Sequence, residues 1–461
     1  MANDALNKTV DVTSGVIWKQ LIVLCVPILL SSIYQQSYAL INTFIVGQFG
    51  GKLALGGIQA TVSLTELCIG FCVGIGSGCA VIIGQYFGRH DYAHLNRSVQ
   101  TAMYMAIAGG LFLSVCGILF SDEVLALMGT PEDLMVEAVD YSRCYFGAMV
   151  FSLIMNMGAA ILRAVGNAKT PSFVIAKGCF LNVILDLIFV VGFKMEALGC
   201  GIATACSIAF SSFLTCRELA KMSPEWRLDF KNPIFDARLA RIMLSTGLPL
   251  GIQSSVYAVS NIIVQSTINS FGTDAVTGWG LAGRLDSFVW MTVEALGVAV
   301  TTFSAQNFGA GNYERMRKGY HVSMALTLVV VGSLSAFLTV FVGPLSRIFI
   351  DDPSVTSYTT IMIQFIAPFY WMYSVVDNTS GAIRGSGESF KPMVLTILGT
   401  CIFRVVWLLV FVPLHHSLEM VLITYPVTWA LTAVMFLVYH HFGHWLTSAK
   451  KREERRAEIV I

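Results

Sequence analysis

The chain has 461 residues, of which 55% are hydrophobic and only 12% are charged, and its formal net charge is +1. Soluble domains carry roughly 25% charged residues, so the composition excludes an ordinary soluble protein, and the balanced charge offers no basic surface for nucleic acid. Apolar runs long enough for a helical span of about 20 residues recur along the chain, without the alternation typical of β-barrel strands. We therefore expect an all-α polytopic membrane protein.

Taken in chain order, the apolar runs predict twelve transmembrane helices. Their expected ranges are 17–47, 54–85, 95–120, 136–161, 171–193, 198–219, 239–270, 276–306, 316–345, 357–383, 393–413 and 418–443. The only long polar stretch inside the chain follows the sixth run. We accordingly divide the chain into an N-terminal six-helix lobe (1–220), a cytoplasmic linker (221–238), a C-terminal six-helix lobe (239–445) and a charged cytoplasmic tail (446–461).

The distribution of basic residues predicts the orientation in the membrane. About 23 of the 29 Lys and Arg fall on one side, which the positive-inside rule assigns to the cytoplasm. Both termini are then cytoplasmic, which agrees with an even number of spans. We expect a multi-pass protein of the plasma membrane that works as a monomer, and its 11 cysteines, mostly inside apolar runs, to be unpaired packing residues.

An internal repeat relates the two expected lobes. Gln85-Tyr86-Phe87-Gly88 resembles Gln306-Asn307-Phe308-Gly309, and Ile161–Gly166 resembles Ala382–Gly387, both at a spacing of 221. Phe49-Gly50 and Phe271-Gly272 match at a spacing of 222. With six spans per lobe both copies enter from the same side, which predicts a parallel repeat whose lobes rock to expose a central cavity alternately.

Ionisable residues inside spans are costly and normally face a cavity or a partner. Asp186 lies in mid-span, and Asn182 precedes it by one turn on the same helix face. Together with the hydroxyl of Thr204 on the next span, these side chains could coordinate a cation or share a proton. We regard this group as the candidate coupling site, with Na⁺ possible at Asp186 and Asn182.

Other embedded polar residues are assigned to a substrate cavity or to structure. Asp377 precedes Arg384 by seven residues, as Asn156 precedes Arg163, and we place Asp377, Asn156 and Glu294 in the substrate cavity. Arg404 could pair with a carboxylate and alone is interpreted as structural. Arg284 and Asp286 are expected near a helix end. Pro27 lies inside the first span and is a candidate hinge.

No cofactor or catalytic set is predicted. The chain has no phosphate-binding G-x-x-x-x-G-K-[ST] loop, so an ion gradient is the expected energy source, and no enzyme activity is expected. His440, His441 and His444 have superficially metal-like spacing, but no carboxylate or cysteine lies near enough in the sequence to complete a set.

Several of these segments together resemble the multidrug and toxic compound extrusion (MATE) family, over nearly the whole chain. They are Ile45-Val46-Gly47, Ile83–Gly88, Ile161–Gly166, Asn182–Asp186, Thr302–Ala310, Arg404–Trp407 and Tyr425–Trp429. The resemblance implies two six-helix lobes and efflux of amphipathic, mostly cationic drugs and toxins in exchange for H⁺ or Na⁺.

The resemblance also implies a cation site that includes an acidic residue in the first span. In this chain Asn42 stands at that position, while Glu66 stands in the second span where an Asn is expected. We hypothesise that the carboxylate has moved from the first span to the second, and we include Asn42 and Glu66 in the coupling site.

Three alternatives stay open at this stage. A related flippase of lipid-linked saccharides would have more cavity arginines, and here only Arg284 and Arg404 are candidates. A membrane-embedded enzyme would need a clustered catalytic set, for which only the histidines at 440–444 are a hint. A scaffold protein would have little reason to keep embedded carboxylates.

Overall fold

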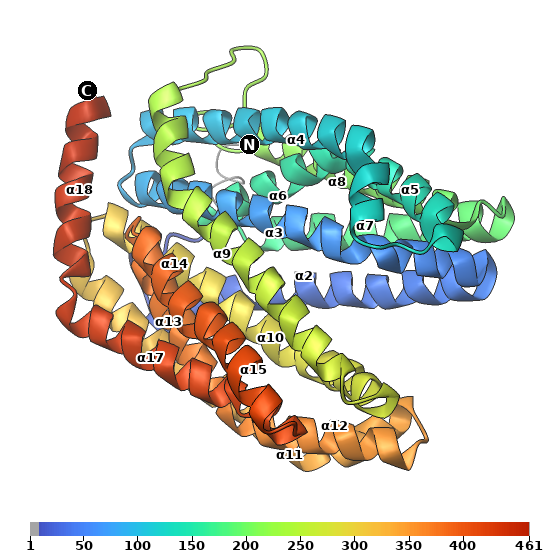
Figure 1. Cartoon of the computed structure of the whole chain (residues 1–461). Coiled ribbons are helices and arrows are strands. Elements are labelled where there is room, and N and C mark those ends of the chain that lie inside the picture. The colour runs from blue at the N-terminus through green and yellow to red at the C-terminus, as the bar shows by residue number, and fades with distance from the viewer. Residues whose placement is uncertain (1–8, 461) are drawn as a thin grey trace. The chain divides into compact units, whose positions relative to one another are not determined.

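The structure is a computed structural model that describes residues 9–460, with side chains described up to Glu454. The first eight residues of the expected N-terminal lobe, and Ile461 of the expected tail, lie outside the described residues. Every regular element between Thr9 and Val460 is a helix (Figure 1). This confirms the all-α architecture expected from the apolar runs.

The helices long and apolar enough to cross a membrane agree with the expected number of spans. Ten such segments occur in the described part of the chain, and a bent pair, Glu132–Gly147 and Met149–Ala164, adds an eleventh. One of the ten, Ile17–Gly88, is 72 residues long and contains the first two expected spans. At 1.5 Å per residue it is far longer than one bilayer crossing requires.

Contacts group the chain into two compact units. The first contains the described residues before Val12 together with Val26–Gly247, and the second contains Val12–Cys25 and Leu248 onward. Relative to the two sequence repeats, each unit therefore includes the opening segment of the other repeat's first helix. We refer to these units as the N-lobe and the C-lobe.

The helices of the N-lobe pack mainly through small residues and a buried aliphatic core on α3, α4 and α6. Gly78, Gly110 and Gly158 let neighbouring helices approach closely, as is typical of membrane helices. The elements are α2 (Ile17–Ile45), the π-helix η1 (Val46–Gly50), α3 (Gly51–Gly88), α4 (Tyr92–Leu127), α5 (Glu132–Gly147), α6 (Met149–Ala164), α7 (Lys169–Asp186), the π-helix η2 (Leu187–Gly192) and α8 (Glu196–Ala220).

The C-lobe repeats this order and is built around a core rich in aromatic residues, with Tyr370 and Trp429 almost completely buried. Its elements are α9 (Ala237–Asn269), α10 (Thr273–Gly309), α11 (Tyr313–Phe349), α12 (Pro353–Ile366), η3 (Ala367–Phe369), α13 (Tyr370–Gly385), α14 (Phe390–Thr396), the π-helix η4 (Ile397–Ile402), α15 (Phe403–Leu414), α16 (Leu418–Leu422), α17 (Thr424–Phe442) and α18 (Trp445–Val460).

Backbone conformation supports the repeat independently of residue identity. Gly166 and Gly387 have φ of 81° and 82°, and Gly51 and Gly272 have φ of 84° and 93°. Both pairs are 221 residues apart. The sequence comparison paired Gly272 with Gly50, but the backbone pairs it with Gly51. Both Gly51 and Gly272 combine a positive φ with an extended ψ, a conformation that is open only to glycine.

The same spacing of 221 residues relates the residues that cap the N-termini of α4 and α11. The Asp91 side chain accepts a hydrogen bond from the backbone N–H of His94, and Asn312 accepts one from Arg315. Each cap satisfies one N–H that the first turn of a helix leaves without a partner.

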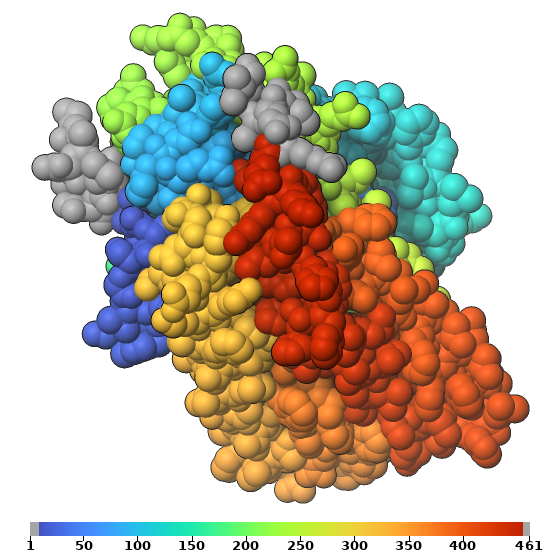
Figure 2. Space-filling view, turned by 90° about the vertical axis from the view of Figure 1, so that its left-hand side faces the viewer, coloured from blue at the N-terminus to red at the C-terminus, as the bar shows by residue number. Residues whose placement is uncertain are grey.

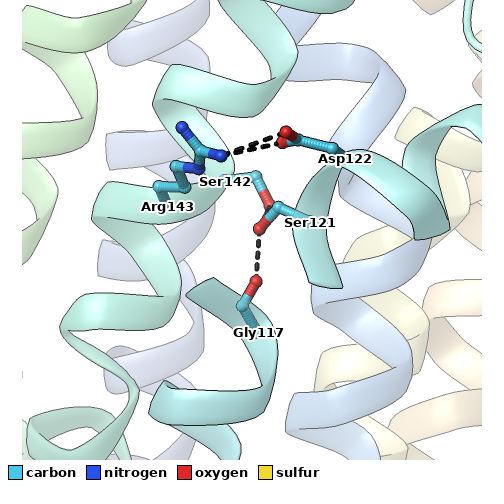
Figure 3. Close-up of polar contacts among 5 residues, drawn as sticks. All are labelled: Gly117, Ser121, Asp122, Ser142 and Arg143. Carbon is cyan, nitrogen blue, oxygen red and sulfur yellow. Dashed lines mark hydrogen bonds and ion pairs between the residues drawn. The ribbon is translucent and has the colours of Figure 1, made fainter. Parts of the chain in front are cut away.

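Helices α4 and α5 are joined by a small polar cluster, which Figure 3 shows in detail. Arg143 donates to both carboxylate oxygens of Asp122 at 3.0 and 3.2 Å, while Ser142 donates to Ser121. About half of each charged side chain is exposed, so we expect the ion pair to contribute less than about 1 kcal/mol.

The C-terminal helix α18 lies on the surface of the C-lobe, where Figure 2 shows it in dark red. Its buried face contains Trp445, Leu446 and Ala449. Arg452 forms an ion pair with Glu388, and the Lys450 ammonium lies 3.6 Å from the centre of the Tyr313 ring. This helix is thus fixed to the lobe by apolar and charged contacts.

Candidate functional site

A cavity of about 550 Å³ lies inside the N-lobe, and we refer to it as the N-lobe cavity. Its wall contains Asn42, Glu66, Asn156, Asn182 and Thr204, so five of the predicted site residues lie around one space. They come from α2, α3, α6, α7 and α8, which the fold brings together from distant parts of the sequence.

A chain of polar contacts joins α2 to α8 along this wall. The Asn42 amide donates to the Tyr38 hydroxyl at 2.8 Å, and that hydroxyl lies 3.4 Å from the Thr204 hydroxyl. The Asn42 carbonyl accepts a hydrogen bond from the Cys200 thiol at 3.2 Å. Asn42 is therefore held at both ends of its side-chain amide.

Asp186 lies behind this network with an exposure of 0%. Neither of its carboxylate oxygens has a hydrogen-bond partner among the described residues, and the same is true of the Asn182 carbonyl oxygen. The Asn182 amide nitrogen donates a hydrogen bond to the Ser207 hydroxyl at 2.7 Å, so this nitrogen is already engaged. Burying a carboxylate without a donor is very costly, so the arrangement calls for a proton or a cation.

The donor set fits a small hard cation such as Na⁺, because the three oxygens without partners are acceptors only. Asp186 and Asn182 would hold such an ion, and Thr204 offers a nearby hydroxyl. No group of three or more His, Cys, Asp or Glu side chains arranged to hold a metal occurs in the described part of the chain. The site therefore suits an exchangeable ion better than a structural transition metal.

Glu66 is the exposed carboxylate of the N-lobe cavity, in contrast to the buried Asp186. It lies on α3, on the wall formed with Asn156 and Tyr145. The predicted residue Asn156 therefore lies in the N-lobe, whereas Asp377 and Glu294, with which we grouped it from sequence, line a cavity in the C-lobe.

This second space, the C-lobe cavity, has a volume of about 670 Å³. Seven aromatic side chains contribute to its wall: Tyr257, Trp279, Trp290, Tyr370, Tyr373, Tyr425 and Trp429. Trp290 packs edge-on against Tyr373 and Trp429, with ring centres 5.1 and 5.7 Å apart. Three carboxylates, those of Asp286, Glu294 and Asp377, share the wall. Aromatic faces beside carboxylates are the surroundings that an organic cation prefers.

Arg284 and Asp286 were placed wrongly by sequence reasoning. We expected both near a helix end, but both lie well inside α10, which runs from Thr273 to Gly309. Asp286 is the one that lines the C-lobe cavity. Its carboxylate accepts hydrogen bonds from the Trp290 indole at 3.0 Å and from the Tyr370 hydroxyl at 2.9 Å. The i, i+4 spacing of Asp286 and Trp290 was a signal that could have located it.

Asp377 is fixed from two sides. On one side the Arg384 guanidinium lies 3.4 Å from the Asp377 carboxylate, and the two residues form an ion pair within the same helix. On the other side the carboxylate rests against α10 at Gly297, where an added Cβ would come within 1.9 Å of an Asp377 oxygen. The glycine is needed because the carboxylate occupies the space of a side chain.

Arg404 does not pair with a carboxylate among the described residues, contrary to one expectation from sequence. Its guanidinium lies 4.6 Å from the Tyr425 ring centre and 5.6 Å from that of Tyr257. It donates to the Asn261 carbonyl oxygen at 3.4 Å. Cation–π contacts with two tyrosines thus take the place of an ion pair.

Two helical lobes related by a parallel repeat, each with helices long and apolar enough to cross a membrane and each with a cavity lined in part by polar residues, define the class of protein as a membrane transporter. The family model described as MatE matches residues 27–188 and again 249–410, one match for each repeat. The chain belongs to this family, the multidrug and toxic compound extrusion transporters. Members of the family are transporters and not enzymes.

Relatives of known description agree with this assignment. The chain is 28% identical over 439 residues to the probable multidrug resistance protein YoeA of Bacillus subtilis, covering 92% of this chain and 94% of that protein. It is 23% identical to an FAD transporter of Shewanella oneidensis, covering 83% of this chain and 86% of that protein.

The fold is also that of solved structures. One is described as the outward-facing conformation of a multidrug resistance MATE family transporter, with a TM-score of 0.87 and 19% identity over 96% of this chain and 99% of that one. The solved structure confirms the two-lobed fold, and the family match and the relatives confirm the expectation of a drug-efflux transporter.

Proposed function

We propose that this protein is an antiporter that exports amphipathic, mostly cationic drugs and toxins in exchange for H⁺ or Na⁺. The single observation that supports it best is the buried Asp186 carboxylate, whose oxygens lack any donor among the described residues. A group in this state binds a cation or a proton whenever one is accessible, which is what a coupling site requires. Asn182, Thr204 and Asn42 complete the site.

Transport then follows from competition between two ligands for two conformations. The coupling ion favours one arrangement of the lobes and the drug favours the other, and each needs only a difference in its affinity for the two. The aromatic and acidic wall of the C-lobe cavity suits an organic cation, with Asp377 and Glu294 as candidate contacts. Asn156 is a candidate contact in the N-lobe cavity.

Pro27 is the proposed hinge for this alternation of access. The boundary between the compact units falls at Cys25 and Val26 within α2, and again at Gly247 and Leu248 within α9. Pro27 and Pro249 follow these boundaries by two residues each. Proline removes a backbone hydrogen bond from the helix interior and so lowers the cost of bending there.

We further propose that the protein acts as a monomer in the plasma membrane with both termini in the cytoplasm. The concentration of Lys and Arg on the side of the linker and the tail supports this orientation.

Purified protein in liposomes tests the coupling directly. A fluorescent organic cation is loaded, and a proton gradient and a sodium gradient are imposed in separate experiments. We expect one of the two gradients to drive dye transport well above the rate in empty liposomes. Transport unaffected by either gradient would reject antiport.

The exposed carboxylate on α3 gives a further prediction. If Glu66 has taken over the role of the acidic residue missing at Asn42, Glu66→Gln should reduce gradient-driven efflux at least about tenfold, since the substitution removes a titratable charge while keeping the size. The rate of dye transport as a function of pH is the measurement, with Glu132→Gln on the exposed start of α5 as the control. A Glu66→Gln protein with the same transport rate and the same pH dependence as the wild type would exclude Glu66 from the coupling site.

A further inference from the structure

Arg404 occupies an unusual position in the C-lobe. It lies at the start of α15, and at the repeat spacing of 221 this start corresponds to the last residues of α7, the helix that ends at Asp186 in the N-lobe. Its exposure is 0%, and it is among the largest fully buried side chains of the protein. Corresponding segments of the two lobes thus each carry a fully buried charged residue, and the two charges have opposite signs.

The charge of Arg404 is poorly compensated. Its Nε and Nη2 groups have no acceptor among the described residues. The hydrogen bond to Asn261 is 3.4 Å long, beyond the usual range of about 2.7–3.2 Å. A buried guanidinium needs several acceptors, and the contacts with Tyr257, Tyr425 and Asn261 still leave Nε and Nη2 without one.

Three carboxylates line the cavity, and two of them are engaged elsewhere. Asp286 accepts from Trp290 and Tyr370, and Asp377 pairs with Arg384. Neither these two carboxylates nor Glu294 forms an ion pair with Arg404 in the described residues. The Nε and Nη2 groups of Arg404 therefore have no acceptor that the described residues supply.

The three residues that Arg404 contacts, Tyr257, Asn261 and Tyr425, all line the C-lobe cavity. We propose that Arg404 is the recognition group for a carboxylate on the transported molecule, and that the C-lobe cavity takes aromatic zwitterions. The substrate carboxylate replaces the weak contact with Asn261 and pairs with the guanidinium. The substrate amine faces the carboxylates of the same wall, and its ring system packs among the aromatic side chains.

The inference rests on the proposed export function and narrows it. The N-lobe, with Asp186, holds the coupling cation, while the C-lobe, with Arg404, selects substrates by their acid group. Molecules that carry only a positive charge still bind through the aromatic and acidic wall, but they gain nothing from Arg404.

Equilibrium binding to the purified full-length protein tests the inference without any ion gradient. The probes are a rhodamine with a free benzoate, which is a zwitterion, and the methyl ester of the same dye, which is a cation. Fluorescence anisotropy gives both affinities. Arg404→Gln should weaken binding of the zwitterion about tenfold to a hundredfold, the value of a charge-assisted hydrogen-bonded pair, and leave the ester nearly unchanged. Arg404→Lys should recover part of the loss.

A second variant keeps the arginine and so avoids an empty buried site. Asn261→Asp places a carboxylate beside the guanidinium, which should occupy it and weaken only the zwitterion. Arg347→Gln, which removes an exposed arginine on α11, is the matched control. If Arg404→Gln fails to fold, Asn261→Asp decides.

Equal losses for both dyes in folded variants would assign Arg404 to structure alone and overturn the inference. So would a zwitterion affinity that neither variant changes, or a wild-type protein that binds only the ester. In that last case the export proposal stands, because it depends on gradient-driven transport of a cation and not on the acid group.

Discussion

Asp186→Asn is expected to abolish gradient-driven efflux, reducing it to the rate of liposomes without protein. Asparagine has the same shape as aspartate, so the packing around α7 should persist. Its amide neither takes up a proton near neutral pH nor supplies a negative charge to a cation. The amide also places two N–H donors where the two carboxylate oxygens of Asp186 accept no hydrogen bond from the described residues. The coupling ion would lose its main ligand.

The measurement is dye transport under an imposed proton or sodium gradient, with the amount of inserted protein determined in parallel. Asp122→Asn is the matched control, since this carboxylate is about half exposed and pairs with Arg143 outside the cavity. Dye binding without a gradient should survive in Asp186→Asn, which separates loss of coupling from loss of the fold. Efflux at the wild-type rate would remove Asp186 from the mechanism.

The second large effect is expected at Gly78. A Cβ at this position would lie 2.2 Å from the Cα of Gly247 and 2.3 Å from its nitrogen, so α3 and the first part of α9 are in backbone contact. A Cβ on Gly247 would likewise meet the Ile75 carbonyl oxygen at 2.6 Å. Gly78→Ala must push two helix backbones apart, and overpacking of this kind costs about 1–3 kcal/mol.

We expect Gly78→Ala to lower the melting temperature of the purified protein by several degrees, and Gly78→Val to prevent accumulation of folded protein. Gly332→Ala on α11 is the control, because nothing lies within 4 Å of a Cβ there. Thermal unfolding followed by size-exclusion chromatography gives the comparison. A melting temperature for Gly78→Ala equal to that of the control would show that the two helices separate at no cost.

Much of the fold was predictable because its signals are long or repeated. Apolar runs predicted the helices, and loops such as Gln85–Gly88 and Gln306–Gly309 predicted the repeat. Embedded carboxylates such as Asp186 are rare in membrane spans, so their presence alone indicated a site. Helical spacing and the order of the spans also grouped Asn182 with Thr204, and both line the N-lobe cavity.

The rest depended on which side chains meet across helices. Asp286 looked peripheral because its partners are only visible once α10 and α13 are packed together and Tyr370 reaches it. The surroundings of Arg404 come from two other helices, α17, which follows it in the chain, and α9, which lies far from it in the sequence. The sequence also gave no indication that compact units and repeats would differ by one helical segment each.

That exchange of segments has a consequence for how the protein is made. Val12 donates to the Gln306 side chain and accepts from Asn307 and Arg315, all of which are synthesised nearly 300 residues later. The opening segment Val12–Cys25 therefore cannot form these contacts until the second repeat has been synthesised. Neither repeat expressed alone holds all the pieces of a lobe, so a gene cut at the linker should yield folded protein only when both fragments are produced in the same cell.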